Sequence, residues 1–412
     1  MKKTLLLTML LLSVFLCGCV LEKTIDSAMV HTTHQVTETT TVAKKVAEPF
    51  IGFSETEPKS IDQLLQLKPE ELQNYTSQYG KYNGYTYYQH LNDTEKLVYH
   101  AYEYAMDEGL PYFWVDERLL QGMERSLFQI LEFYSLDSAV VEQNIAIVEE
   151  SYTAPRTWSD GQGGRPTYTT IYVEDFTKQR LQHKNQAILN AKIVIARLNG
   201  YEAYSHLELA EHFYDYLGGC VEYVEDVESD EYLYSGLFEG KTNCDGFANA
   251  FALMCRLTEV PCIEINSDTL RGKIGHTWNM VCLKGQWVHV DATGAGDDVW
   301  SLCANRKEKW VYFGLPDALL QDRMLYAELL PDCPVGLTPV EKISSVRVEN
   351  FRIRVKNAFR ENDNKCAVIL LDRGELDEQT AGELATELGF NLHYVSYKTV
   401  GGKMVYYLFR DN

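Results

Sequence analysis

Residues 243–293 of this 412-residue chain restrict its fold more than any other segment, because they join a capped helix to two apolar strands. Asn243 is a favourable N-cap residue for a helix that begins at the next position. Apolar residues then recur with helical spacing at Phe247, Phe251, Met254 and Cys255. Two apolar runs, 276–282 and 286–293, flank Lys284-Gly285, a pattern typical of a β-hairpin. The segment therefore predicts a helix followed by an antiparallel pair of strands.

The length of the hairpin loop fixes which residues of the two strands face each other. With a two-residue loop, His276 faces Thr293 and Trp278 faces Asp291. Direct partners share a face of the sheet, and so do residues two apart on one strand. His276 and Asp291 are therefore expected diagonally on one face, roughly 7–8 Å apart at the backbone. A shift of one residue in the register would place them on opposite faces.

Cys244 is expected in the first turn of the predicted helix. Unpaired backbone N–H groups in such a turn favour a thiolate, and they could also hold the oxyanion of an acyl intermediate. Gly246 and Ala248 would keep the turn slim enough for a substrate backbone to approach. Asp245 argues in the other direction, because a neighbouring negative charge opposes a thiolate.

Cys244, His276 and Asp291 together have the composition of a thiol-based catalytic triad. A thiol needs a base to become a nucleophile, and a carboxylate holds the base in the correct tautomer. The alternative is structural: a buried cysteine, a core histidine and a cap at the end of a strand. That alternative is favoured for each residue alone, whereas the shared face of the hairpin favours the catalytic interpretation for the three together.

The region resembles the transglutaminase-like superfamily, a papain-like group in which Cys, His and Asp occur in this chain order. The matching segments are 240–248 (GKTNCDGFA), 276–279 (HTWN) and 287–293 (WVHVDAT). The helical segment Asp215-Tyr216-Leu217 resembles the region that precedes the nucleophile in bacterial members. The resemblance covers about residues 202–300. It implies that Cys244 is the nucleophile, His276 the base and Asp291 the residue that orients the base.

The resemblance also implies a fold and a reaction. The expected fold is α+β, with a papain-like transglutaminase core in which a helix packs on an antiparallel sheet, a helical N-terminal region and a small C-terminal α/β domain. The expected chemistry is acyl transfer at an amide bond without a cofactor. Water as the second substrate would make the protein a peptidase or amidase, and an amine would make it a transamidase. The expected substrate is a protein, a peptide or a peptidoglycan peptide.

Three positions depart from the pattern of the family. Bacterial relatives more often have an aromatic residue or Val in place of Asn243, Tyr in place of Phe247 and Trp in place of Gly294. None of these changes removes a catalytic group, but all three positions should lie near the substrate. The substrate class and the choice between hydrolysis and transamidation therefore stay open. A non-catalytic module that uses this fold to bind a partner at the cell surface is the alternative function.

The N-terminus predicts export from the cytoplasm. Lys2 and Lys3 precede an apolar run over residues 5–16, which is typical of a secretory signal rather than of a membrane span. The Leu-x-Gly-Cys pattern that ends at Cys19 resembles a bacterial lipobox, which implies lipidation of Cys19 and an anchor at the cell surface. An ordinary cleaved signal and an uncleaved anchor are the alternatives.

Charge and cysteine content narrow the classes of partner and cofactor. The net charge of −21 argues against nucleic acid and anionic lipid surfaces as binding partners. The cysteines form no Cys-x-x-Cys pair, so the sequence carries no zinc motif, although disulfides stay open. Asp297-Asp298 could bind calcium, but adjacent acids in a loop are usually only solvated.

The remaining patterns predict the following organisation: signal peptide 1–19, flexible tether 20–60, mainly helical region 61–200, catalytic domain 201–335 and C-terminal domain 336–412. Helices are expected after the capping box at residues 92–95, over about 116–149 and 175–198, and from Ser205 to Gly218. In the C-terminal domain, Phe351, Ile353 and Val355 predict a strand by their alternation, and residues 367–371 predict another. A helix near 377–388 and a hairpin across Gly401-Gly402 should follow.

Overall fold

The structure is a computed structural model, and it describes residues 48–75, 87–138, 153–157, 165–172, 178–225, 227, 231–267, 275–296, 312–320, 323–337, 339–361 and 366–410. The expected signal peptide, the expected lipidation site Cys19 and Asp297-Asp298 lie outside these residues. All described residues belong to one compact unit, Ala47–Asn412. Within them, no helix combines the length and the apolar character that crossing a bilayer requires.

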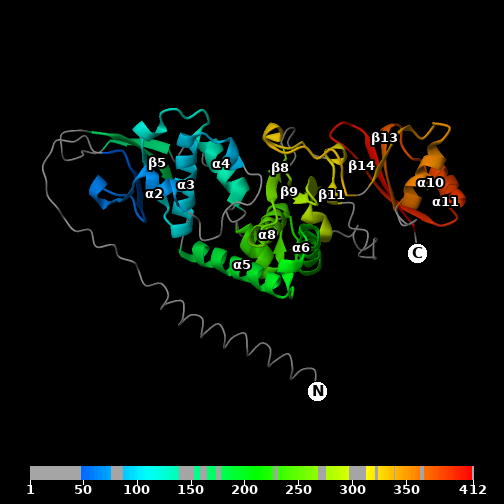
Figure 1. The fold of residues 1–412 in the computed structure, drawn as a ribbon, viewed down its shortest axis with the longest axis horizontal. Coiled ribbons are helices and arrows are strands. Elements are labelled where there is room, and N and C mark those ends of the chain that lie inside the picture. The colour runs from blue at the N-terminus through cyan, green and yellow to red at the C-terminus, as the bar shows by residue number, and fades with distance from the viewer. Residues whose placement is uncertain are drawn as a thin grey trace, which may run out of the picture. The chain divides into compact units, whose positions relative to one another are not determined.

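The centre of the fold is the helix α8 (Cys244–Leu257), which packs against a four-stranded antiparallel sheet (Figure 1). The strand order is β11-β10-β9-β8. The strands are β8 (Cys262–Asn266), β9 (Thr277–Leu283), β10 (Gln286–Val290) and β11 (Phe313–Leu315). The predicted α+β class and the helix-on-sheet core are confirmed.

The predicted hairpin is present with the predicted register. Gln286 pairs with Leu283 and Val290 pairs with Asn279, so the loop contains only Lys284 and Gly285. Both loop residues have positive φ, 53° and 76°, as a tight turn between twisted antiparallel strands requires. Even-numbered residues of β9 therefore share one face of the sheet and odd-numbered residues share the other.

Two further helices complete the core around α8. They are α5 (Lys178–Ala196) and α6 (His206–Cys220), and their apolar faces join one cluster with α8 and the β9–β10 hairpin. Ser205 and Glu208 form the capping box that opens α6, as expected, but the helix runs two residues beyond Gly218. The predicted catalytic domain began at residue 201, whereas α5 packs in the same core, so the core begins earlier in the chain. The short elements β6 (Glu222–Tyr223), α7 (Tyr232–Tyr234) and β7 (Lys241–Thr242) lead into α8.

The N-terminal region was expected to be mainly helical, and beside its helices it also contains a five-stranded sheet of order β2-β1-β3-β5-β4, which the sequence did not predict. Its strands are β1 (Ile51–Ser54), β2 (Leu65–Leu67), β3 (Tyr112–Asp116), β4 (Thr153–Thr157) and β5 (Thr167–Tyr172). Its helices are α2 (Pro69–Gln73), α3 (Asp93–Glu108) and α4 (Leu127–Ser138). Strand β3 is buried along nearly its whole length, so it lacks the alternation that would reveal a strand in the sequence.

Two boundaries in this region also need correction. The tether was expected to run to residue 60, but β1 pairs with both β2 and β3, and Phe53 is buried. The helix expected over 116–149 begins only at Leu127, because Asp116 ends β3 and Asp116 then caps a 3-10 turn. The capping box at Asn92 and the left-handed Gly109 at the end of α3 agree with the sequence.

The N-terminal region covers the second face of the central sheet. Ile263, Ile265, Trp278 and Met280 belong to one apolar cluster with residues of α3 and α4. Val281 and Val288 instead point into the cluster that contains α8. The central sheet is therefore buried on both faces, by α8 on one side and by the N-terminal region on the other.

The C-terminal residues form a four-stranded sheet of order β12-β13-β15-β14 with two helices (Figure 1). The elements are β12 (Val340–Ser345), α10 (Phe351–Glu361), β13 (Cys366–Arg373), α11 (Glu378–Leu388), β14 (Leu392–Lys398) and β15 (Met404–Arg410). The hairpin across Gly401-Gly402 is present between β14 and β15. The strand predicted from Phe351, Ile353 and Val355 is wrong. Phe351 and Val355 are buried on one face of α10, whereas Ile353 is 63% exposed.

Both faces of the C-terminal sheet are covered. Ile369 and Leu371 of β13 pack in one cluster with α10 and α11. Val368 and Leu370 face the other way and pack against Leu315 and Leu319, which follow the central sheet in the chain. The segment 312–320 thus contacts the central sheet through β11 and the C-terminal sheet through these two leucines.

Candidate active site

Cys244 is the first residue of α8 and has 9% of its surface exposed. The side-chain oxygen of Asn243 accepts hydrogen bonds from the amides of Asp245 and Gly246, at 3.1 and 3.4 Å. The N-cap predicted at Asn243 is thus confirmed. The cap thus uses the amides of Asp245 and Gly246 and not that of Cys244.

Gly246 is required by packing within the protein, which differs from the reason expected from the sequence. A Cβ atom at this position would lie 1.9 Å from Oγ1 of Thr242 and 2.5 Å from the carbonyl oxygen of Tyr232. Both distances are far below any contact that real Cβ atoms make. The absent side chain therefore lets α8 pack against the segment that precedes it.

His276 and Asp291 lie on one face of the sheet and are joined by a hydrogen bond of 2.7 Å between Nε2 and Oδ2. The other carboxylate oxygen of Asp291 accepts from the amide of Thr293 at 3.1 Å. The backbone amide of His276 donates to Oγ of Ser267 at 2.7 Å, which fixes the start of β9. The Asp291 carboxylate is thus held by the Thr293 amide as well as by the imidazole, and the His276 backbone is held by Ser267.

The charge state of His276 follows from its neighbours. Burial alone would lower the pKa of His276, but the Asp291 carboxylate and a hydrogen bond with the Cys244 side chain raise it to about 11. Because Nε2 is bound to Asp291, Nδ1 is the atom left for the sulfur. The structure thus brings the three residues singled out in the sequence together, with His276 in contact with both of the others.

Asp245 and Thr277 form a second connection between α8 and β9. Oγ1 of Thr277 lies 2.5 Å from Oδ1 of Asp245 and 3.0 Å from Oδ1 of Asn266. Burial raises the pKa of Asp245, so its carboxyl is less readily charged than an exposed one. The two residues directly follow Cys244 and His276 in the chain, and their contact therefore fixes the spacing of the thiol and the imidazole. The objection that Asp245 opposes a thiolate is weakened by the same shift.

The comparisons with known proteins agree with this geometry. Residues 195–292 match the family model described as "Transglutaminase-like superfamily". This range contains α6, α8, the β9–β10 hairpin, and all three residues Cys244, His276 and Asp291.

The chain has a transglutaminase-like core.

Two curated relatives match part of the chain. The Kyphoscoliosis peptidase of Mus musculus is 33% identical over 113 residues, which are 23% of this chain and 17% of the relative. The Kyphoscoliosis peptidase of Homo sapiens is 40% identical over 67 residues, which are 14% of this chain and 10% of the relative. The chain therefore matches less than a fifth of the length of either relative. A crystal structure of a TGase is 15% identical over 37% of this chain and 47% of its own, with a TM-score of 0.24.

One departure from the family pattern has a structural counterpart in the transglutaminase-like core. A Cβ atom on Gly294 would lie 2.2 Å from Cδ2 of Tyr312. The ring of Tyr312 thus occupies the space into which a side chain at position 294 would extend. Tyr312 also accepts a hydrogen bond from the amide of Asp291 at 2.7 Å through its carbonyl oxygen. An aromatic ring thus lies beside Gly294, and a later segment of the chain supplies it.

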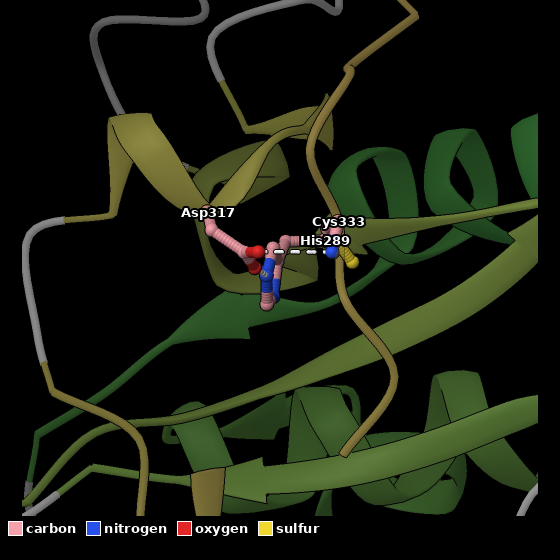
Figure 2. Close-up of side chains that lie close together, drawn as sticks. All are labelled: His289, Asp317 and Cys333. Atoms are coloured by element: carbon pink, nitrogen blue, oxygen red, sulfur yellow. Dashed lines mark hydrogen bonds and ion pairs between the residues drawn. The ribbon is translucent and has the colours of Figure 1, made fainter. Parts of the chain in front are cut away.

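The structure adds two residues to which the sequence assigned no role, His289 and Asp317, and Figure 2 shows them close together. Nδ1 of His289 accepts a hydrogen bond from the indole Nε1–H of Trp278 at 3.0 Å, and Nε2 lies 2.9 Å from Oδ1 of Asp317. The ring of Trp278 stacks on that of His276, with centroids 5.8 Å apart and planes inclined by 19°. His289 lies in the quoted segment 287–293, and its face could have been predicted from the hairpin register. Asp317 carries no signal in the sequence.

His289, Asp317 and Cys333 are the one group in the described part of the chain whose ligand atoms could surround a metal ion, all within 4.8 Å of one another. The hydrogen bonds argue against such a role. Because Nδ1 of His289 accepts from the indole, the ring hydrogen is on Nε2. A metal bound at Nε2 would displace this hydrogen and would need an imidazolate, with no hydrogen on either ring nitrogen. Burial, followed by nearby carboxylates, also raises the pKa of the Cys333 thiol. The group is better described as a hydrogen-bonded network.

The cysteines within the described ranges are free thiols: Cys220, Cys244, Cys255, Cys262, Cys282, Cys333 and Cys366. Cys220 is exposed, and Cys255 is fully buried on α8. The availability of a second, exposed thiol matters for any experiment that labels Cys244.

Proposed function

We propose that this protein performs thiol-dependent acyl transfer at an amide bond outside the cytoplasm, with Cys244, His276 and Asp291 as its catalytic residues. The observation that carries the proposal is His276, which is hydrogen-bonded to Asp291 at 2.7 Å and has its pKa raised to about 11 by Asp291 and Cys244. An imidazole in this state is protonated at neutral pH and stabilises a thiolate beside it.

In the proposed reaction, the sulfur of Cys244 attacks the carbonyl carbon of the substrate amide. The C–N bond breaks, His276 gives its proton to the leaving amine, and an acyl group stays on the sulfur. Water or a second amine then attacks this thioester and gives a proton to His276, the C–S bond breaks, and the acyl group leaves as an acid or a new amide while the Cys244 sulfur is set free. Asp291 holds the imidazole in the required orientation and stabilises its positive charge.

The oxyanion of the intermediate needs a hydrogen-bond donor near Cys244. Asn243 uses the amides of Asp245 and Gly246 for the helix cap. We therefore assign the backbone amide of Cys244 as one oxyanion donor, because it belongs to the same first turn and precedes the two capped amides.

The proposed substrate is a protein, a peptide or a peptidoglycan peptide, met at the bacterial surface by a protein anchored through lipid on Cys19. Cys19→Ser should release the mature protein from membranes into the soluble fraction. A wild-type mature form that is soluble and begins downstream of Cys19 would contradict the anchor and would leave the proposed chemistry unaffected.

The test of the chemistry compares the labelling of two thiols in the same protein. Iodoacetamide at pH 6 should alkylate Cys244 faster than Cys220, which is exposed and serves as the internal reference. Peptide mass spectrometry would give both rates. His276→Ala should remove the preference for Cys244, and Cys282→Ala should leave it unchanged as the matched cysteine control.

Activity itself should be measured on peptides and peptidoglycan fragments, with and without a labelled primary amine. Hydrolysis alone would identify a peptidase or amidase, and incorporation of the amine would identify a transamidase. Cys244→Ala should abolish either activity, and Asp291→Asn should leave part of it. A folded Cys244→Ala protein with full biological function would instead favour the surface-binding module.

A further inference from the structure

We propose that His289 and Asp317 are positioning residues that hold the ring of His276 in its working orientation through Trp278. The inference rests on the proposed function, because it concerns how the proposed base is held. It extends the site to a residue that is distant in the sequence from Cys244, His276 and Asp291.

The hydrogen bonds of His289 determine its tautomer and fix the indole of Trp278. Nδ1 accepts from the indole N–H at 3.0 Å, so the ring hydrogen is on Nε2 and is donated to Oδ1 of Asp317 at 2.9 Å. Trp278 and His289 are 4% and 1% exposed, so the bond between them is shielded from water, whereas the Asp317 side chain is 39% exposed. Rotation of the indole would leave a buried N–H group and a buried ring nitrogen without partners, which is costly.

Asp317 is itself held in place by two hydrogen bonds to one residue. Its second carboxylate oxygen accepts from the amide of Cys333 at 2.9 Å, and its own amide donates to the carbonyl oxygen of Cys333 at 2.9 Å. Burial opposes the charged carboxylate, but the hydrogen bonds from His289 and Cys333 outweigh it and lower the pKa of Asp317. The carboxylate is therefore a fixed, charged acceptor at neutral pH.

The fixed indole of Trp278 in turn restricts the orientation of the His276 ring in the candidate active site. The imidazole of His276 lies against the indole of Trp278, with the two planes inclined by only 19°. The bond from Asp291 fixes one atom of the imidazole but allows rotation about that atom. The indole face restricts the plane of the ring, so the two constraints together aim Nδ1 at the sulfur of Cys244.

The main variant is His289→Leu, which removes both hydrogen bonds and keeps a side chain of similar size. We expect it to lower the rate of Cys244 alkylation by iodoacetamide on the order of 10-fold, because small misplacements of catalytic groups have effects of this size or larger. His289→Gln should restore most of the rate, since its amide oxygen can accept the indole N–H and its amide nitrogen can donate to Asp317. Asp317→Asn should lie between wild type and His289→Leu.

The matched control is His100→Leu in the N-terminal region. His100 is a half-buried histidine that also makes two side-chain contacts, to Glu103 at 3.1 Å and to Tyr88 at 3.0 Å. Its replacement should lower the thermal stability of the protein without changing the labelling of Cys244. A loss of alkylation in His289→Leu that His100→Leu reproduces would overturn the inference, because general destabilisation would then explain both.

A second readout does not depend on catalysis. NMR of protein with labelled histidine should show the ring resonances of His276 shifted by the stacked indole, with assignment by their loss in His276→Gln. His289→Leu should move these resonances and His289→Gln should return them. If His289→Leu does not fold, Trp278→Phe replaces it, since it keeps an aromatic ring and removes the N–H together with the five-membered ring of the indole. Unchanged His276 resonances and an unchanged alkylation rate in a folded variant would refute the inference.

Absence of selective alkylation in the wild type would refute the proposed function, and the resonances would still decide the role of His289.

Discussion

Replacement of Gly246 by Ala should destabilise this protein, although the same change usually stabilises a helix. Alanine in a helix interior is favoured over glycine by about 1 kcal/mol. At this position, however, the new Cβ would meet Oγ1 of Thr242 at 1.9 Å and the carbonyl oxygen of Tyr232 at 2.5 Å. These two atoms are also joined by a hydrogen bond of 3.1 Å, which the added methyl group would break.

The opposing effects can be compared in size. Overpacking of a buried site costs about 1–3 kcal/mol, and loss of the hydrogen bond adds about 1 kcal/mol. After the gain in helix propensity, the expected net loss is about 1–3 kcal/mol, or roughly 1–4 °C in the midpoint of thermal unfolding for a compact unit as large as Ala47–Asn412. Because Cys244 lies two residues earlier on α8, the displaced turn should also slow its alkylation.

The control for this prediction is Gly219→Ala, on the helix α6 that packs against α8. A Cβ atom there meets no atom within 4 Å, so the change should be neutral or should stabilise the protein by up to about 1 kcal/mol. Thermal and urea unfolding of the two variants would be measured beside wild type. Gly246→Ala with wild-type stability and wild-type alkylation would show that the close packing at the start of α8 is not needed.

Three further predictions concern buried groups. Glu95→Gln should cost about 1.5–3 kcal/mol, because the buried Glu95 carboxylate accepts from three backbone amides and one arginine. Burial opposes the charge of Glu95, but these hydrogen bonds outweigh it and lower the pKa of the carboxyl. The stabilisation is therefore present above pH ~4.3 and is lost as the pH falls. At low pH the unfolding curves of wild type and Glu95→Gln should converge. Cys255→Ala should cost about 1 kcal/mol through a small cavity and leave Cys244 labelling unchanged, as urea unfolding and mass spectrometry would check. Folding raises the pKa of His276, so its positive charge stabilises the folded state fully below pH 6.5 and progressively less as the pH rises to about 11. Any difference in stability between wild type and His276→Gln that arises from this charge should therefore vanish by pH 11.

The helix, the hairpin and the position of the candidate site could be predicted because each depends on short-range signals. Asn243 caps its own helix within three residues, and the two-residue loop sets the register by geometry alone. The shared face of His276 and Asp291 follows from that register. Asp317 could not be found in this way, because its contact with His289 depends on how β11 returns to the sheet, which nothing near Asp317 in the sequence encodes.

The errors elsewhere have physical causes of the same kind. Strand β3 is buried almost throughout, so its sequence shows no alternation, and a short apolar run does not distinguish a buried strand from a helix. Around Phe351, three apolar residues at alternate positions imitate a strand, whereas the buried residues continue to Ala358 and Phe359 with helical spacing. In both cases tertiary packing determines whether the segment is a strand or a helix, and five consecutive residues carry no information about that packing.

The segment 312–320 connects the candidate active site to the C-terminal sheet, which is synthesised last. Asp317 belongs to this segment, and Leu319 accepts a hydrogen bond from the hydroxyl of Tyr397 at 2.9 Å through its carbonyl oxygen. The strand β15, which lies between β13 and β14, leaves the ribosome long after Cys244 and His276. If Asp317 depends on this support, the thiol is synthesised early but becomes fully reactive only when β15 has joined its sheet. In a protein truncated before Met404, Cys244 should then be alkylated more slowly than in the full chain, and equal rates would show that the site matures without the C-terminal sheet.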